Sequence, residues 1–128
     1  MKTTFRSHLA HMKESAGLGP NPVFDDGERV FVKGIFRIPR PNRHFVGNRP
    51  GNDVRPIYQS PFTDSLGDVD NLSKFVLDAM NGVMYGDDRQ VAALLAIKCN
   101  DDDVSNGGST DLSMATISND ELRTLMNL

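Results

Sequence analysis

Residues 70–81 constrain the fold most, because their apolar side chains follow one face of a helix. This face is formed by Leu72, Phe75, Val76, Ala79 and Met80, which recur at intervals of three and four residues. Asp68 or Asp70 stands at the N-cap position, and Gly82 follows as a C-terminal cap glycine. A helix with one apolar face must bury that face, so the rest of the chain has to supply a packing layer.

The other regular patterns predict what that layer is. They indicate a helix over 3–16, a strand over 29–38 and a capped terminal helix over 118–126. Two further apolar segments, 91–99 and 110–117, predict a buried strand and its partner, joined as a hairpin by an acidic loop. The sequence therefore predicts an α+β fold, a small mixed sheet with helices packed on one face.

Composition places the chain among small globular domains. Its 128 residues suffice for a single domain, expected over 1–128 with a core of about 24–118. The segment 39–67 holds five prolines and three glycines, which predicts a long loop, mobile in part without a ligand. One cysteine excludes an internal disulfide, and no apolar run approaches the roughly 18 residues of a membrane span.

Charge is divided unevenly along the chain. Residues 1–57 carry ten Lys or Arg and five Asp or Glu, whereas residues 58–128 carry four and twelve. Seven of the basic residues lie within 29–55, where Asp53 is the one acid. This asymmetry indicates a polyanionic partner for the first half and a cation for the second.

Carboxylates flank the predicted central helix. Asp68 and Asp70 are two residues apart and can point to the same side, and a chain that turns back along the helix would bring Asp88 to them. Three carboxylates at one point suit Mg²⁺ or Mn²⁺. The alternative is a helix cap and a solvated turn. An EF-hand does not fit, because Leu72 and Ser73 occupy the positions that require a ligand and glycine.

Residues 67–91 closely resemble the signature of RusA-type Holliday junction resolvases. The signature reads D-x-D-N-L-x-K, then D-A-L, then D-D-x-Q-V, and nearly all of it is present between Asp68 and Val91. The segment 36–45 also resembles an Arg-Pro-x-x-His-Phe element of phage-type members. Gly67 stands in place of the usual proline, the 39–67 loop is long, and the strand that usually precedes the first helix has no counterpart.

The resemblance implies the catalytic residues. Asp68, Asp70 and Asp88 match the family's three acids, with Asp87 beside the metal, and Lys74 matches the lysine placed at the phosphate. From spacing alone, Lys74 is equally explained by ion pairs along the helix. The resemblance further implies a Mg²⁺-dependent homodimer, with Mn²⁺ as a substitute, that nicks two strands of a four-way junction symmetrically.

The same resemblance predicts where the enzyme acts. We expect branched DNA as partner, no membrane, and a location in the cytoplasm of a bacterial or phage-infected cell, at the nucleoid. A nuclease for other branched or flap DNA, a non-catalytic DNA-binding protein with this fold, and a plain cation-binding module are the alternatives.

Basic side chains form the candidate DNA surface, because arginine forks suit phosphate. This set comprises Arg37, Arg40, Arg43, His44, Arg49, Arg55, Lys74 and Lys98. A solvated basic loop is the alternative, and for His44 a core or turn position. The acids at 101–103 indicate a solvated turn, with a second cation site as the lesser alternative.

Overall fold

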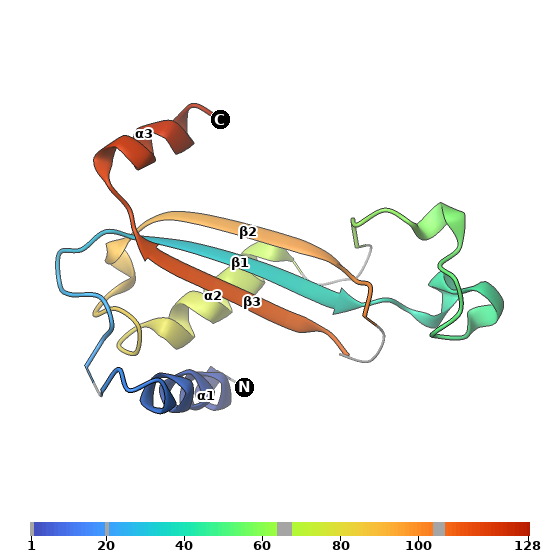
Figure 1. Cartoon of the computed structure of the whole chain (residues 1–128), viewed down its shortest axis with the longest axis horizontal. Coiled ribbons are helices and arrows are strands. Elements are labelled where there is room, and N and C mark those ends of the chain that lie inside the picture. Colours follow the sequence, from blue (N-terminus) through green and yellow to red (C-terminus); the bar gives the residue numbers. More distant parts are fainter. Residues whose placement is uncertain (1, 20, 64–67, 104–106) are drawn as a thin grey trace.

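The computed structural model describes residues 2–19, 21–63, 68–103 and 107–128 (Figure 1). Three strands form its sheet: β1 (Val30–Pro39), β2 (Val91–Asp101) and β3 (Ser109–Thr116). Their order is β2-β1-β3, with β2 parallel and β3 antiparallel to β1. The prediction of an α+β fold with a small mixed sheet is confirmed.

The predicted hairpin between 91–99 and 110–117 is wrong, because both strands pair with β1 instead of with each other. The reason lies in β1, whose alternate side chains Val30, Val32 and Phe36 are the most deeply buried apolar residues of the sheet. A strand of this kind is most stable with neighbours on both sides. Gly108, just before β3, lies against Pro39 at the end of β1.

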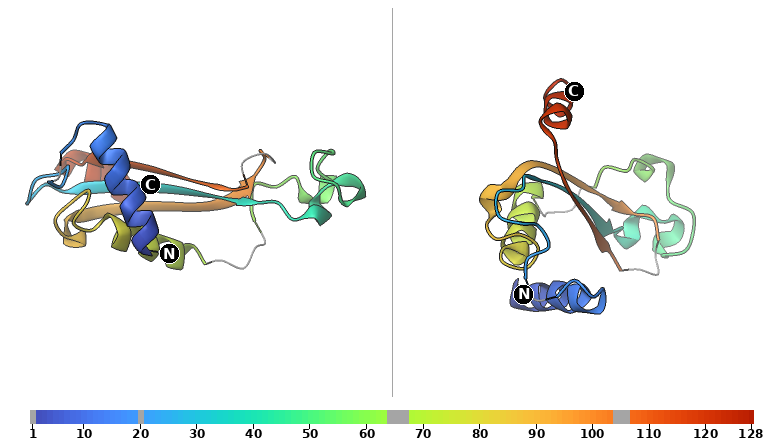
Figure 2. Two further views of the ribbon diagram at one scale, coloured as in Figure 1. Left: turned by 90° about the horizontal axis from the view of Figure 1, so that it is seen from below. Right: turned by 60° about the vertical axis from the view of Figure 1, so that its left-hand side comes forward.

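Two helices lie on one face of the sheet, as predicted (Figure 2). The helix α2 (Val69–Met80) packs its apolar side on β1, and α1 (Lys2–Ser15) packs against α2. Val76 and Met80 of α2 join the buried residues of β1 and Tyr85 in one core. The third helix, α3 (Asn119–Met126), has the predicted Ser118–Glu121 capping box and extends away from this body (Figure 1).

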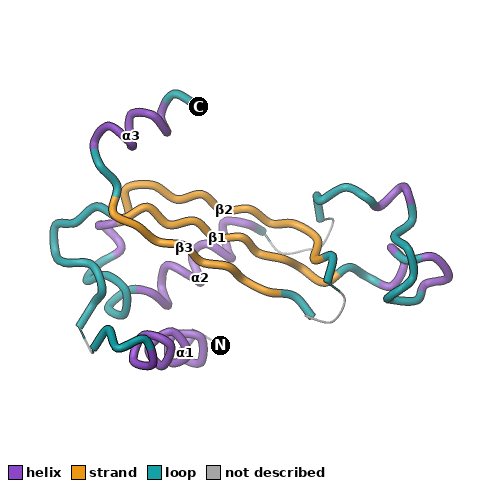
Figure 3. Tube along the Cα trace, in the orientation of Figure 1, coloured by secondary structure: helices purple, strands orange, loops and turns teal. Residues whose placement is uncertain are grey.

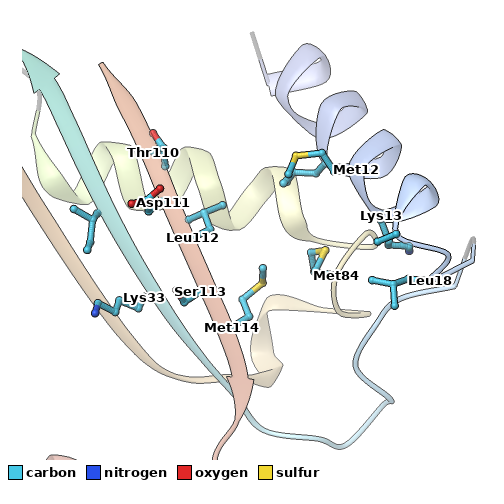
Figure 4. A pocket seen from close by; sticks show the side chains of 13 residues that line it. Met12, Lys13, Leu18, Lys33, Met84, Thr110, Asp111, Leu112, Ser113 and Met114 are labelled. Atoms are coloured by element: carbon cyan, nitrogen blue, oxygen red, sulfur yellow. The ribbon is translucent and has the colours of Figure 1, made fainter. Parts of the chain in front are cut away.

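A buried lysine fixes the position of α1. The Nζ of Lys13 donates hydrogen bonds to the carbonyl oxygens of Val83, at 2.8 Å, and Asn21, at 2.5 Å. Beside it, an apolar groove of about 690 Å³ lies between α1 and β3, with Met12, Met84 and Met114 among its lining (Figure 4).

The two ends of the sheet carry different candidate residues. At the end where β1 and β2 finish, residues 40–63 form a separate folded segment with three short 3₁₀ turns, which we call the 40–63 module (Figure 3). The start of α2 points towards this end, and the 81–90 turn lies at the opposite one (Figure 1). Among the described residues, no helix has the length and apolar character needed to cross a membrane.

Candidate active site and DNA-facing module

The start of α2 presents two exposed carboxylates. Asp68 is the N-cap residue, with extended backbone angles of φ −80° and ψ 139°, and its carbonyl accepts the first helical hydrogen bond from Leu72. Its side chain makes no cap hydrogen bond. Asp70 follows in the first turn, exposed to solvent. The backbone of Asp68 thus begins the helix while its carboxylate remains on the surface.

The other acid pair lies in a tight turn ahead of β2. Asp87 caps the 3₁₀ turn 88–90 through a hydrogen bond from the backbone N–H of Arg89, at 2.8 Å. That bond is the main reason why the pKa of Asp87 lies below its usual range. Asp88 is exposed beside it. The structure therefore gives the two neighbours different surroundings, with Asp87 bonded into the turn and Asp88 facing solvent.

The predicted meeting of Asp88 with Asp68 and Asp70 does not occur within one chain. The helix between them has 12 residues, which makes it about 18 Å long. The charge of Asp88 helps to raise the pKa of Tyr85, and the Tyr85 hydroxyl donates to the Leu77 carbonyl near the end of α2. Asp88 therefore lies near the end of the helix, and Asp68 lies at its start. The chain turns directly from α2 into β2 instead of running back along the helix. Among the described residues, no group of three metal-binding side chains is close enough to hold an ion.

Gln90 organises the turn that carries Asp88. Its Oε1 accepts from the backbone N–H of Gly86, at 2.9 Å, and of Asp87, at 3.2 Å. Its Nε2 donates to the carbonyl oxygens of Asp25, at 2.8 Å, and Glu28, at 3.2 Å. The glutamine of the D-D-x-Q-V motif therefore joins this turn to the segment before β1. The motif by itself did not reveal this role.

We expect Gln90→Ala to lower the free energy of unfolding by about 1–3 kcal/mol, because four backbone groups lose their partner. Denaturant unfolding measures the loss. Arg89→Ala is the matched control, since the Arg89 side chain is solvent-exposed and its removal should change stability by less than about 0.5 kcal/mol. Equal stability of the two variants would contradict the role of Gln90.

Tyr85 makes the stability of the fold depend on pH at this end of α2. Burial, and after it the charges of Asp88, Asp78 and Asp87, raises the pKa of Tyr85 to about 12. The folded chain holds the phenol neutral, so its contribution to stability is complete below pH 10 and is lost as the pH rises from about 10 to about 12.

In metal-free protein, Tyr85→Phe should therefore flatten the alkaline loss of stability, and Asp88→Asn should lower the Tyr85 pKa. Tyrosinate absorbance measures the titration, and comparison with Tyr85→Phe identifies the part of the signal that belongs to Tyr85, since the chain has two tyrosines. An unchanged Tyr85 titration in Asp88→Asn would contradict the placement of Asp88 beside it.

The 40–63 module is built around Arg40. The Arg40 side chain is 3% exposed and binds Asp102 with two nitrogens, at 2.9 and 3.0 Å. It also donates to the carbonyl oxygens of Tyr58, at 2.7 Å, and Ser60, at 3.4 Å. The buried ring of His44 stacks on Tyr58, with ring centroids 4.2 Å apart. The structure thus places Arg40 and His44 inside the module, and not on the DNA-facing surface predicted from the sequence.

The other predicted DNA-binding residues divide into three groups. Arg43, Arg49 and Lys74 are exposed. Arg37 pairs with Asp111 across β1 and β3, and Arg55 donates to the Phe45 carbonyl, at 3.1 Å, and to Asn48, at 3.3 Å. Lys98 is half-buried on β2. Residues 39–63 are extensively hydrogen-bonded and 64–67 lie outside the described residues, so the expected mobility of 39–67 stays a prediction.

Asn100, at the end of β2, is a further organising residue that carried no sequence signal. Its backbone N–H donates to the Pro61 carbonyl at 2.9 Å, and its side-chain Nδ2 donates to the Phe62 carbonyl at 2.8 Å. These bonds hold the end of the module against the sheet. Of the neighbouring acidic loop, 101–103 are described: Asp101 is buried, and Asp102 pairs with Arg40 instead of being only solvated.

Comparison with known proteins assigns the family. The model of the family described as endodeoxyribonuclease RusA matches residues 4–106 of the 128. The match includes both acid pairs, Lys74, the module and β2. No curated protein and no solved structure matches the chain significantly. Because the family match covers most of its length, the chain belongs to the RusA family of endodeoxyribonucleases, the structure-specific enzymes that resolve Holliday junctions.

Proposed function

We propose that this RusA-family nuclease uses Mg²⁺, bound by Asp68, Asp70 and Asp88, to cut four-way junctions in paired symmetric nicks. The observation that carries the proposal is the pair of exposed carboxylates at the start of α2, where the Asp68 side chain is not used as a helix cap. Carboxylate oxygens are the ligands that Mg²⁺ prefers. When bound, Mg²⁺ supplies charge to polarise the phosphodiester and lowers the pKa of water.

The separation of Asp88 from Asp68 and Asp70 supports a homodimer. Two α2 helices related by a two-fold axis and lying antiparallel would set Asp88 of one chain beside the first-turn acids of the other. Each dimer would then contain two equivalent sites, which suits two symmetric cuts. In a single chain, about 18 Å of helix separates the same carboxylates.

The outer edge of β2 is the surface that favours this arrangement. It has no strand partner among the described residues, and it is 11 residues long. Leu94, Leu95 and Ile97 are between 41% and 45% exposed there, on both faces of the sheet. Long apolar edge strands tend to pair with another chain. Antiparallel pairing of β2 with its copy would place the two α2 helices side by side.

The exposed cations provide the proposed DNA contacts. Arg43 and Arg49 project from the module, and Lys74 lies one helical turn after Asp70, where its ammonium group can bind a phosphate. Arg37, Arg40, His44 and Arg55 have partners within the protein, so we assign Arg40 and His44 to the module's own stability. We place the enzyme at the DNA of a bacterial or phage-infected cell.

A junction cleavage assay tests the function. With Mg²⁺, we expect paired cuts at symmetric positions of a four-way junction, and no cuts after chelation of the metal. Mn²⁺ should substitute. Faster cutting of flaps than of junctions at equal protein would favour the broader nuclease, and junction binding without cutting under either metal would favour a non-catalytic protein.

A further inference from the structure

Among the described residues, Phe62 carries an exposed aromatic ring, and it lies at the end of the sheet towards which α2 begins (Figure 1). Its side chain is 74% exposed, whereas Phe45 of the same module is buried and Tyr58 is stacked on His44. Exposing a phenyl ring to water is unfavourable, and nothing in the described part of the chain covers this one. We propose that Phe62 is a base-stacking contact that receives an unpaired base of the DNA strand entering the site at Asp68 and Asp70.

The backbone under Phe62 is held in place from both sides. Its N–H donates to the Ser60 hydroxyl at 3.1 Å, and its carbonyl accepts from Asn100 at 2.8 Å. The next residue, Thr63, is 2% exposed, and Arg40 donates to the carbonyl of Ser60. The ring is therefore presented on an ordered support, so little conformational entropy remains to be lost when a base stacks on it.

The position of Phe62 fits a strand that approaches the carboxylates. It precedes Asp68 by six residues, and Asn100 holds it at the end of the sheet towards which α2 begins (Figure 1). Arg43 and Arg49 of the same module supply positive charge for the backbone phosphates. Aromatic rings beside such charge are the general means of binding single-stranded DNA, because every base has a π face.

This inference rests on the proposed function, since it names how that site recognises its substrate. The centre of a four-way junction offers bases that are easily unstacked, whereas an intact linear duplex does not. Stacking on Phe62 would thus help the enzyme to prefer branched over linear DNA.

The chain has no tryptophan, so Phe62→Trp introduces a single indole exactly where stacking is proposed. We expect this variant to bind junctions as the wild type does, and its fluorescence to be quenched by junction or single-stranded DNA more than by linear duplex. Ile57→Trp is the matched control, because Ile57 is 82% exposed in the same module and should give little quenching. Fluorescence anisotropy of labelled DNA confirms binding independently of cleavage.

Phe62→Leu separates stacking from simple apolar contact. We expect it to weaken junction binding about tenfold, as loss of one stacked base should, whereas Phe62→Trp, which keeps an aromatic ring, should bind as the wild type does. Junction-bound Phe62→Trp with unquenched emission, or wild-type affinity of Phe62→Leu, would overturn the inference. Binding is measured without metal, so failure of the stacking contact is distinct from failure of the proposed nuclease, which shows as absent cleavage.

Discussion

Mixing Asp70→Asn chains with Asp88→Asn chains should restore nicking that neither variant shows alone. Each variant is expected to lose more than about 100-fold in cleavage rate, since a carboxylate ligand of the metal is removed from every site. In a mixed dimer, the Asp88→Asn chain contributes an intact Asp70, and the Asp70→Asn chain contributes an intact Asp88. One of the two shared sites is then complete.

The mixed dimer should make single nicks instead of paired cuts. A supercoiled plasmid with an extruded junction separates the two outcomes, because a single nick gives the nicked circle and paired cuts give the linear form. A mixture of Asp68→Asn with Asp70→Asn is the control. Each shared site takes Asp68 and Asp70 from the same chain, so no site in this mixed dimer has both acids. Restored activity in that control, or none in the Asp70 and Asp88 mixture despite confirmed mixed dimers, would contradict a shared site.

Arg40→Ala should lower the free energy of unfolding by about 2–3 kcal/mol. The substitution removes a buried guanidinium and leaves the Tyr58 and Ser60 carbonyl oxygens without this donor. The full cost of breaking a buried ion pair does not apply, because Asp102 is 82% exposed and water can replace its partner. The loss should concentrate in the 40–63 module, which Arg40 joins to the end of β2.

Arg49→Ala serves as the matched control for that prediction. Arg49 is exposed, so its removal should change stability by less than about 0.5 kcal/mol while weakening DNA binding and its salt dependence. Denaturant unfolding and limited proteolysis of the module measure the first effect, and binding at several salt concentrations measures the second. If Arg40→Ala is as stable as Arg49→Ala, Arg40 is not the support of the module.

Local patterns were sufficient for the elements of this fold. The apolar spacing of 72–80 predicted α2, and Ser118 with Glu121 predicted the start of α3, because helix periodicity and capping depend on residues three or four apart. The pairing of β3 was not predictable in this way. Whether a strand pairs with its neighbour in sequence or with β1 depends on which partner buries more surface, and that depends on the core that Val30 and Val32 of β1 form with α2, which is distant in sequence.

The sequence by itself determined the family and predicted the candidate metal-binding acids, since the motif from Asp68 to Val91 preserves residue types at fixed spacing. Only the tertiary structure decided which charges are accessible. Arg40 and Arg49 are indistinguishable in a basic loop, yet one is buried on Asp102 and the other faces solvent. The same holds for Asp88, which the direct turn from α2 into β2 keeps a helix length away from Asp68. Burial and distance arise from contacts between segments far apart in the chain, which no local pattern records.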